Sequence, residues 1–213
     1  MSDKQAGNTE QLDFWRGEFG STYTERNAAD AWQLQARVRL WSRIMRAMDG
    51  RSPQSILEVG ANLGNNLRAL STMCSATFHA LEPNPTARER LVDDQVVAPE
   101  RVLDGFASEI PLDDGAVELA FTSGVLIHIH PDDLAASCGE IYRVSSRYIV
   151  CIEYFSDKPE VIPYRGHTDK LFKRDFGGFW MDQHPDLQLL DYGFAWKRMT
   201  GLDNLTWWVF EKR

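Results

Sequence analysis

The spacing of hydrophobic residues divides the chain near residue 50. Between residues 34 and 48, apolar side chains recur every three or four positions, which predicts an amphipathic helix that stops at Asp49 and Gly50. The residues of this stripe are Leu34, Val38, Trp41, Met45 and Met48. We expect residues 1–50 to form a helical cap or lid segment and residues 51–213 to form the main domain.

After residue 53, short apolar runs alternate with helical patterns. Strands are predicted over residues 55–59, 77–81, 117–123 and 147–154, and helices over residues 64–74, 84–94 and 132–145. Strands separated by helices pair in parallel through right-handed crossovers, so we expect a three-layer α/β fold. The last two strand-like runs, 187–196 and 205–212, are joined by a link too short for a helical crossover and should therefore be antiparallel.

Composition narrows the class of protein. The 213 residues are 43% hydrophobic and 25% charged, which is typical of a soluble globular chain with one substantial core. The net charge of −8 would repel a phosphate backbone, so no nucleic acid partner is expected. No apolar run is long enough for a bilayer, and the N-terminus lacks the pattern of a secretory signal. We therefore expect a cytoplasmic protein without a membrane partner, and the oligomeric state stays open.

The turn after the first strand, EVGANLG at residues 58–64, is the first sign of a ligand site. A dinucleotide site needs a glycine where this chain has Asn62, because the backbone there approaches a pyrophosphate. The side chain of Asn62 would fill that space, and the carboxylate of Glu58 would oppose the phosphate charges. A Walker loop is excluded because no G-K-S/T sequence follows Gly64.

The same turn suits a cationic or zwitterionic ligand that carries no phosphate. S-adenosylmethionine is such a ligand, since its ammonium and sulfonium groups need acceptors and its ribose diol favours an acid. Glu82 ends the next strand, in TFHALEPN, where a carboxylate can accept hydrogen bonds from both ribose hydroxyls. A structural glycine turn with no ligand is the alternative.

With these residues, the chain resembles the class I S-adenosylmethionine-dependent methyltransferases, whose first motif E/D-x-G-x-x-x-G matches residues 58–64. The resemblance covers residues 50–213 and makes 51–213 the catalytic domain. It implies a Rossmann-like, seven-stranded, mostly parallel sheet with an antiparallel C-terminal strand pair, and S-adenosyl-L-methionine as the cofactor. The cofactor-binding residues that it implies are Glu58, Gly60, Asn62, Gly64, Asn65, Glu82, Pro83, Phe106, Ala107 and Ser123.

Longer motifs resemble a narrower family, the methylases associated with pseudaminic acid biosynthesis. These motifs are W-x-x-x-F-G-x-x-Y-x-x-R-N from Trp15, G-V-L-I-H-I from Gly124, and E-Y-F, Y-R-G-H and K-L-F-K-R-D-F between residues 153 and 176. The family implies a link to nine-carbon acidic sugars, without fixing a reaction.

Methyl transfer is an in-line displacement in which the protein aligns the nucleophile and, for a hydroxyl or protonated amine, removes a proton. His128 follows the fourth strand and is the best-placed general base, with a structural histidine as the alternative. Glu153 ends the fifth strand and is either a second catalytic candidate or a structural acid. The H-I-H triplet at 128–130 has no evident third ligand, so no metal is expected.

The stretch YRGHTDKLFKRDF, residues 164–176, is locally basic and lies in a long insertion where a substrate lid belongs. Cations there favour an anionic acceptor, and Arg165 can grip a carboxylate through two parallel hydrogen bonds. The alternative is that some of these side chains are only solvated. The substrate-binding candidates in and before this stretch are Tyr154, Tyr164, Arg165, His167, Lys170 and Lys173.

The N-terminal aromatic stretch offers further candidates. We assign Tyr23 and Arg26 to the cofactor site, and we expect Trp15 and Phe19 to pack against the sheet.

The sequence therefore predicts an S-adenosylmethionine-dependent methyltransferase for an anionic small molecule, such as a nonulosonic acid or a related sugar or natural-product intermediate. Two alternatives stay open. One is a non-catalytic, methyltransferase-like binding subunit. The other is an NAD-dependent oxidoreductase, against which Asn62 and Glu58 argue. Transfer to oxygen and transfer to nitrogen are not separable from the sequence.

Overall fold

The structure of the chain, a computed structural model, describes residues 10–26, 30–48, 51–167 and 169–213, with the backbone alone for residues 10–12 and 26. The expected helix end at Asp49 and Gly50 lies outside the described residues. The helix itself is present as α3 (Ala31–Arg46).

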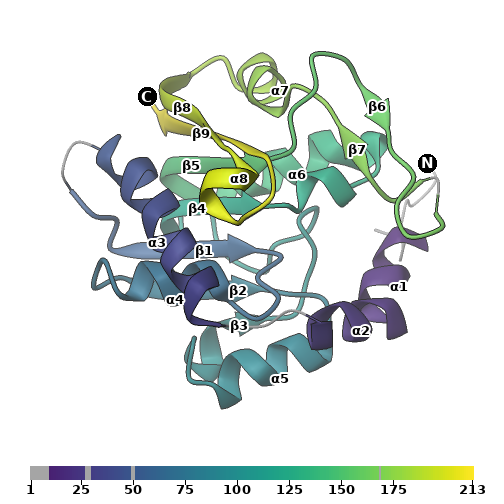
Figure 1. Cartoon of the computed structure of the whole chain (residues 1–213). Coiled ribbons are helices and arrows are strands. Elements are labelled where there is room, and N and C mark those ends of the chain that lie inside the picture. The colour runs from purple at the N-terminus through teal and green to yellow at the C-terminus, as the bar shows by residue number, and fades with distance from the viewer. Residues whose placement is uncertain (1–9, 27–29, 49–50, 168) are drawn as a thin grey trace, which may run out of the picture.

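A seven-stranded sheet forms the centre of the molecule, in the order β3-β2-β1-β4-β5-β9-β8 (Figure 1). The pairs among β1 to β5 are parallel, whereas β9 is antiparallel to both β5 and β8. This confirms the predicted fold class and the terminal antiparallel pair. The strands are β1 (Ser55–Val59), β2 (Thr77–Leu81), β3 (Val102–Leu103), β4 (Val117–Ser123), β5 (Ser145–Glu153), β8 (Leu187–Ala195) and β9 (Leu205–Lys212).

Helices cover both faces of the sheet and enclose two hydrophobic cores. One core lies under α3, α4 (Asn65–Ser71) and α5 (Pro85–Asp93), and the other lies under α6 (Pro131–Val144) and α7 (Phe176–Gln183). The adjacent residues Trp207 and Trp208 on β9 contribute to different cores, as the alternation of side chains along a strand requires. Burial on both faces explains why the central strands are nearly continuous apolar runs.

Local signals set the helix starts. The side chains of Asp30, Asn84 and Asp175 accept backbone N–H bonds at the N-termini of α3, α5 and α7, an interaction worth about 1 kcal/mol each. The short elements are η1 (Pro99–Arg101), η2 (Leu126–His128) and α8 (Lys197–Thr200).

Two segments lie beside the carboxyl edge of the sheet (Figure 1). The first, which we call the cap, consists of α1 (Glu10–Arg16) and α2 (Glu18–Arg26). The second, which we call the flap, covers residues 155–174 and contains the small antiparallel pair β6 (Glu160–Val161) and β7 (Phe172–Lys173). The chain leaves the flap after β7, and α7 begins at Phe176.

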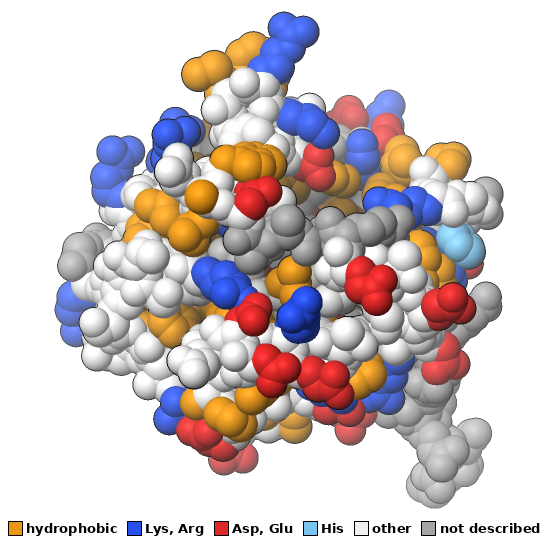
Figure 2. Space-filling model, turned by 60° about the horizontal axis from the view of Figure 1, so that its bottom comes forward, with side chains coloured by type: hydrophobic (Ala, Val, Ile, Leu, Met, Phe, Trp, Pro, Cys, Tyr) orange, Lys and Arg blue, Asp and Glu red, His pale blue; other side chains and the backbone are white. Residues whose placement is uncertain are grey.

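The surface seen in Figure 2, which brings the bottom of Figure 1 forward, carries acidic and basic side chains intermingled. In the described part of the chain, no helix combines the length and the apolar character that crossing a bilayer requires.

Candidate functional site

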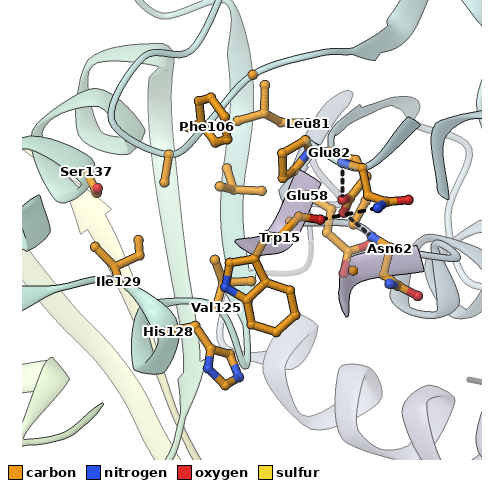
Figure 3. Close-up of a pocket in the computed structure, with 18 of the residues that line it drawn as sticks. Trp15, Glu58, Asn62, Leu81, Glu82, Phe106, Val125, His128, Ile129 and Ser137 are labelled. Carbon is orange, nitrogen blue, oxygen red and sulfur yellow. Dashed lines mark hydrogen bonds between the residues drawn. The ribbon is translucent and has the colours of Figure 1, made fainter. Parts of the chain in front are cut away.

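A cavity of about 1000 Å³ lies at the carboxyl ends of β1, β2 and β4. Its walls are the turn after β1, the end of β2, residues 104–111, the turn into η2 and the start of α6, and the cap covers one side (Figure 3). Ligands of open α/β sheets bind at this edge. The volume is at the upper end of the usual range for one drug-sized ligand, so a nucleoside and a small acceptor have room together.

The turn after β1 depends on a close approach that only glycine permits. Gly60 has a φ of +72° and donates its N–H to the carbonyl oxygen of Leu81 at 2.8 Å. A Cβ at this position would stand 2.6 Å from Cγ2 of Val125. The turn after β1 therefore packs directly against the turn after β4.

Glu82 connects the turns after β1 and β2. Its carboxylate is buried, and it accepts the backbone N–H of Asn62 at 2.7 Å and that of Asn84 at 2.8 Å (Figure 3). Burial raises the pKa of Glu82, and the two N–H donors oppose that rise. The side chain also lines the cavity, where the sequence predicts a ribose contact.

Glu58 lies on the cavity wall at the end of β1 and is buried. Its Oε1 accepts a hydrogen bond from Nδ2 of Asn66 at 2.7 Å, whereas its Oε2 has no partner in the described part of the chain. Burial raises the pKa of Glu58 to about 8, and the positive charge of Arg37 opposes this. A buried carboxyl group with an unsatisfied oxygen favours a cationic group in the adjoining space.

The side chain of Asn62 is engaged by the cap. Its Nδ2 donates to Oγ1 of Thr24 on α2 at 3.1 Å, and its Oδ1 accepts the N–H of Leu63 at 2.9 Å. Asn84 holds α1 in a similar way, since its Nδ2 donates to the carbonyl oxygen of Trp15 at 3.2 Å. The cap is thus attached to the same two turns that Glu82 connects.

Most of the other predicted cofactor residues also line the cavity: Tyr23, Asn65, Pro83, Phe106, Ala107 and Ser123. Gly64 is not among the lining residues. It is the N-cap of α4 with a φ of +67°, and a Cβ there would stand 2.7 Å from Leu91, so its role is packing. The side chain of Arg26 lies outside the described residues, and its assignment stays a prediction.

Two cations line the cavity that the sequence did not single out. Arg37 on α3 is half-buried, donates to Oε1 of Gln33 at 3.0 Å, and has a pKa lowered by burial. Arg16 on α1 pairs with Asp104 at 2.8 Å and lies 4.4 Å from the ring centre of Phe106. In the sequence, Arg37 only flanks the apolar stripe of its helix. Its side chain faces the cavity because of the way that α3 is rotated against the sheet.

His128 lies at the end of η2. The centre of its ring is 4.8 Å from the ring centre of Trp15 and 5.1 Å from that of Tyr164. Its Nδ1 is 2.7 Å from the carbonyl oxygen of Lys170. A carbonyl only accepts, so Nδ1 carries the proton and the lone pair of the neutral ring is on Nε2. Burial lowers the pKa of His128 to about 4, so the ring is neutral at pH 7.

Glu153, the second catalytic candidate, is not among the residues that line the cavity. It is fully buried behind the turn into η2, and its carboxylate accepts backbone N–H groups of Val125, Leu126 and Ile127. It therefore has no direct access to a substrate in this structure.

None of the six predicted substrate-binding residues is among the residues that line the cavity. Tyr164 and His167 form a bridge in the flap, and the ring of His167 is 5.0 Å from that of Phe14 in the cap. Lys170 is buried and pairs with Asp169 at 3.1 Å. Arg165 is exposed at the tip of the flap. The flap and the cap thus meet through aromatic rings next to His128.

The two remaining candidates lie at the base of the flap. The hydroxyl of Tyr154 donates to Oδ2 of Asp203 at 2.8 Å, and burial together with this carboxylate raises the pKa of Tyr154. Nζ of Lys173 lies 5.4 Å from the ring centre of Tyr154. Across the described residues, no group of three His, Cys, Asp or Glu side chains gathers in a way that could hold a metal ion.

Residues 57–147 match the sequence profile of a family described as a methyltransferase domain. No curated protein matches the chain in sequence. This part of the chain is thus similar to a methyltransferase domain, which supports the predicted enzyme class.

Solved structures with the same fold cover most of the chain. The 1,6-didemethyltoxoflavin-N1-methyltransferase of Burkholderia thailandensis, determined with its substrate and S-adenosylhomocysteine, is 19% identical with a TM-score of 0.72, over 100% of this chain and 93% of that one. A SAM-dependent methyltransferase of Leishmania major is 16% identical with a TM-score of 0.71, over 95% and 86% of the two chains. The ligand of the first structure, S-adenosylhomocysteine, is the demethylated form of the predicted cofactor S-adenosylmethionine.

A third structure shows the limit of such a comparison. The cyclase SpnF is 13% identical with a TM-score of 0.64, over 88% of this chain and 84% of that one. The similarity at these identities shows the fold, and a fold does not determine the reaction. The narrower resemblance to the methylases of pseudaminic acid biosynthesis stays a prediction.

Proposed function

We propose that this chain transfers a methyl group from S-adenosyl-L-methionine to an anionic small molecule, a nonulosonic acid or a related sugar or natural-product intermediate. The observation that carries the proposal is the pair of buried carboxyl groups, those of Glu58 and Glu82, on either side of the turn at the cavity. Two acids at this turn suit a cationic nucleoside and oppose a pyrophosphate.

The residues present fit this cofactor. Glu82 accepts hydrogen bonds from the ribose hydroxyls, and Glu58 faces the ammonium group. Arg37, with Tyr23 beside it on the cavity wall, meets the carboxylate of the methionine portion, and Phe106 borders the adenine. When bound, the cofactor supplies an electrophilic methyl group on its sulfonium centre.

His128 is the general base of the proposal. Its hydrogen bond to the flap carbonyl of Lys170 fixes the tautomer in which Nε2 accepts a proton. Because the pKa is lowered to about 4, the ring is in the accepting form at neutral pH, and it takes the proton of the acceptor as the methyl group is transferred. Glu153 is not proposed to touch the substrate.

The acceptor binds between His128 and the flap. Arg165 lies at the tip of the flap, Lys170 lies 5.6 Å from the ring centre of Phe14 in the cap, and Lys173 lies at the base of the flap. The cavity wall itself carries the acids Glu58 and Glu82. An acceptor with a carboxylate fits this distribution when its anionic group is at the flap and its reactive group is at His128. We propose α1 and α2 as the lid over both ligands.

We further propose that the protein acts in the cytoplasm on a free small molecule, without a nucleic acid or membrane partner. An NAD-dependent oxidoreductase is disfavoured because the chain has Asn62 at the position where a dinucleotide turn needs a glycine, and this side chain is held by hydrogen bonds to Thr24 and Leu63. A non-catalytic binding subunit would not need a neutral histidine in a fixed tautomer at the cavity.

The proposal is tested with S-adenosylmethionine labelled in its methyl group and a mixture of metabolites split into anionic and neutral fractions. We expect label in a product from the anionic fraction, detected by mass spectrometry, with about a hundredfold slower labelling by His128→Ala. Label transferred only to neutral acceptors would refute the acceptor class. Binding of the cofactor product without transfer to any fraction would favour the binding subunit.

A further inference from the structure

One buried carboxylate holds three consecutive backbone amides of the cavity wall. Oε1 of Glu153 accepts the N–H groups of Val125 and Leu126, each at 3.1 Å, and its Oε2 accepts that of Ile127 at 3.4 Å. The side chain comes from the end of β5, the strand next to β4 in the sheet, and none of its surface is exposed. Hydrogen bonds to an ionised acceptor are the stronger class, so this contact fixes the turn after β4.

The turn that Glu153 holds contacts the turn after β1 at its start and leads to His128 at its end. At its start, the side chain of Val125 packs against the backbone of Gly60 in the turn after β1. At its end, His128 donates its backbone N–H to the carbonyl oxygen of Val125 at 2.8 Å. A shift of the turn would therefore move the base and the wall of the cofactor turn together.

We propose that Glu153 is a positioning residue that acts through residues 125–127 on both His128 and the turn after β1. The consequence for methyl transfer rests on the proposed function above, whereas the contact itself does not. Because Glu153 does not line the cavity, it acts through the turn and not on the reacting atoms.

Protonation offers a way to switch this contact. Burial raises the pKa of Glu153 to about 7, against the effect of its N–H donors. Burial also raises the pKa values of the two nearby cysteine thiols, so both are neutral in this range. The side chains that interact with Glu153 or lie opposite it are those of Thr122 of β4, Cys138 of α6, Cys151 of β5 and Thr206 of β9. Arg174 of the flap acts on Cys138, and His128 follows the held turn in the chain. A carboxyl group that gains a proton loses acceptor capacity, so the turn should loosen as the pH falls through about 7.

The test compares Glu153→Gln with Glu118→Gln. Glu118 also accepts a backbone N–H, that of Gln54 at 2.6 Å, but it lies at the other end of β4. We expect the amides of residues 125–127 to exchange with solvent at least about tenfold faster in Glu153→Gln, with the interior of β4 unchanged, and no change there in Glu118→Gln. Circular dichroism checks that both variants are folded.

Two further measurements complete the test. In the unaltered protein, the amide NMR signals of residues 125–127 should titrate near pH 7, and this needs no variant. In Glu153→Gln, the affinity for S-adenosylhomocysteine should fall about threefold to tenfold. Unchanged exchange together with amide signals that do not titrate would overturn the proposal. If the unaltered protein binds no S-adenosylhomocysteine, the proposed function fails, and the exchange result still decides the role of Glu153.

Discussion

The two sides of the cavity are built in different ways. The cofactor side consists of the turns after β1, β2 and β4, which are held by buried carboxylates and by one close backbone approach at Gly60. The roof consists of the cap and the flap, which meet through rings. The contacts join Phe14 to His167 and Phe19 to Tyr164, with centroid distances of 5.0 and 6.2 Å.

This difference separates a fixed half of the site from an adaptable one. Backbone N–H groups that donate to buried acids allow one geometry, because any displacement leaves a buried charge unsatisfied. Ring contacts are less directional and tolerate sliding. A common cofactor suits the first half, and a variable acceptor suits the second.

The largest effect should come from Gly60→Ala on the fixed side. The new Cβ meets Val125 at 2.6 Å, and φ is +72°, so we expect a loss of about 2–5 kcal/mol in the free energy of unfolding. Gly124→Ala is the matched control, since φ is +68° and nothing lies within 4 Å. It should lose about 1–2 kcal/mol, from the backbone strain alone. Equal losses in urea unfolding would show that the close approach does not matter.

Glu82→Ala should weaken binding of S-adenosylhomocysteine about a hundredfold. The substitution removes the carboxyl group that we propose as the acceptor of the ribose hydroxyls, and the same group accepts two backbone N–H groups of the neighbouring turns. Asp94→Ala removes a carboxylate that pairs with Arg68 and does not line the cavity. That control should bind as the unaltered protein does. Calorimetric affinities that match for the two variants would remove Glu82 from the cofactor site.

His128→Ala should lower kcat about a hundredfold and leave the affinity for S-adenosylhomocysteine within about threefold. His184→Ala is the control, because His184 lies at the C-cap of α7 and does not line the cavity. Near-normal turnover of His128→Ala would make His128 a structural residue. If His128→Ala lowered the cofactor affinity and left kcat unchanged, His128 would belong to the fixed half of the site.

The smallest effect should come from the roof. Arg165 is exposed, so Arg165→Ala should raise the acceptor KM only about threefold to fivefold and leave the cofactor affinity unchanged. Arg198→Ala, at an exposed site on α8, controls for the loss of one surface charge. Weaker cofactor binding in Arg165→Ala, with the acceptor KM unchanged, would reverse the assignment of the two halves.

The same division explains what the sequence predicts well. Strand periodicity and the spacing from Glu58 to Gly64 are local, and they lead to the sheet, the first turn and the place of Glu82. The two-residue strand β3 is too short to leave a pattern of its own. Arg37 and Glu153 depend on how a helix is rotated and on which strand lies next to β4. The flap residues depend on contacts between segments that are far apart in the chain.

The central claim, that the first turn holds a cationic nucleoside without phosphate, is tested most directly by calorimetry. In the protein alone, burial raises the pKa of Glu58 to about 8, so this carboxyl group keeps its proton at pH 7. A bound ammonium group favours the ionised form, and the proton leaves. Titration with S-adenosylhomocysteine at pH 7, in two buffers of different ionisation enthalpy, should therefore show that binding releases about half to one proton. The variant Glu58→Gln should release none. Binding without proton release, or tighter binding of NAD than of S-adenosylhomocysteine, would contradict the account.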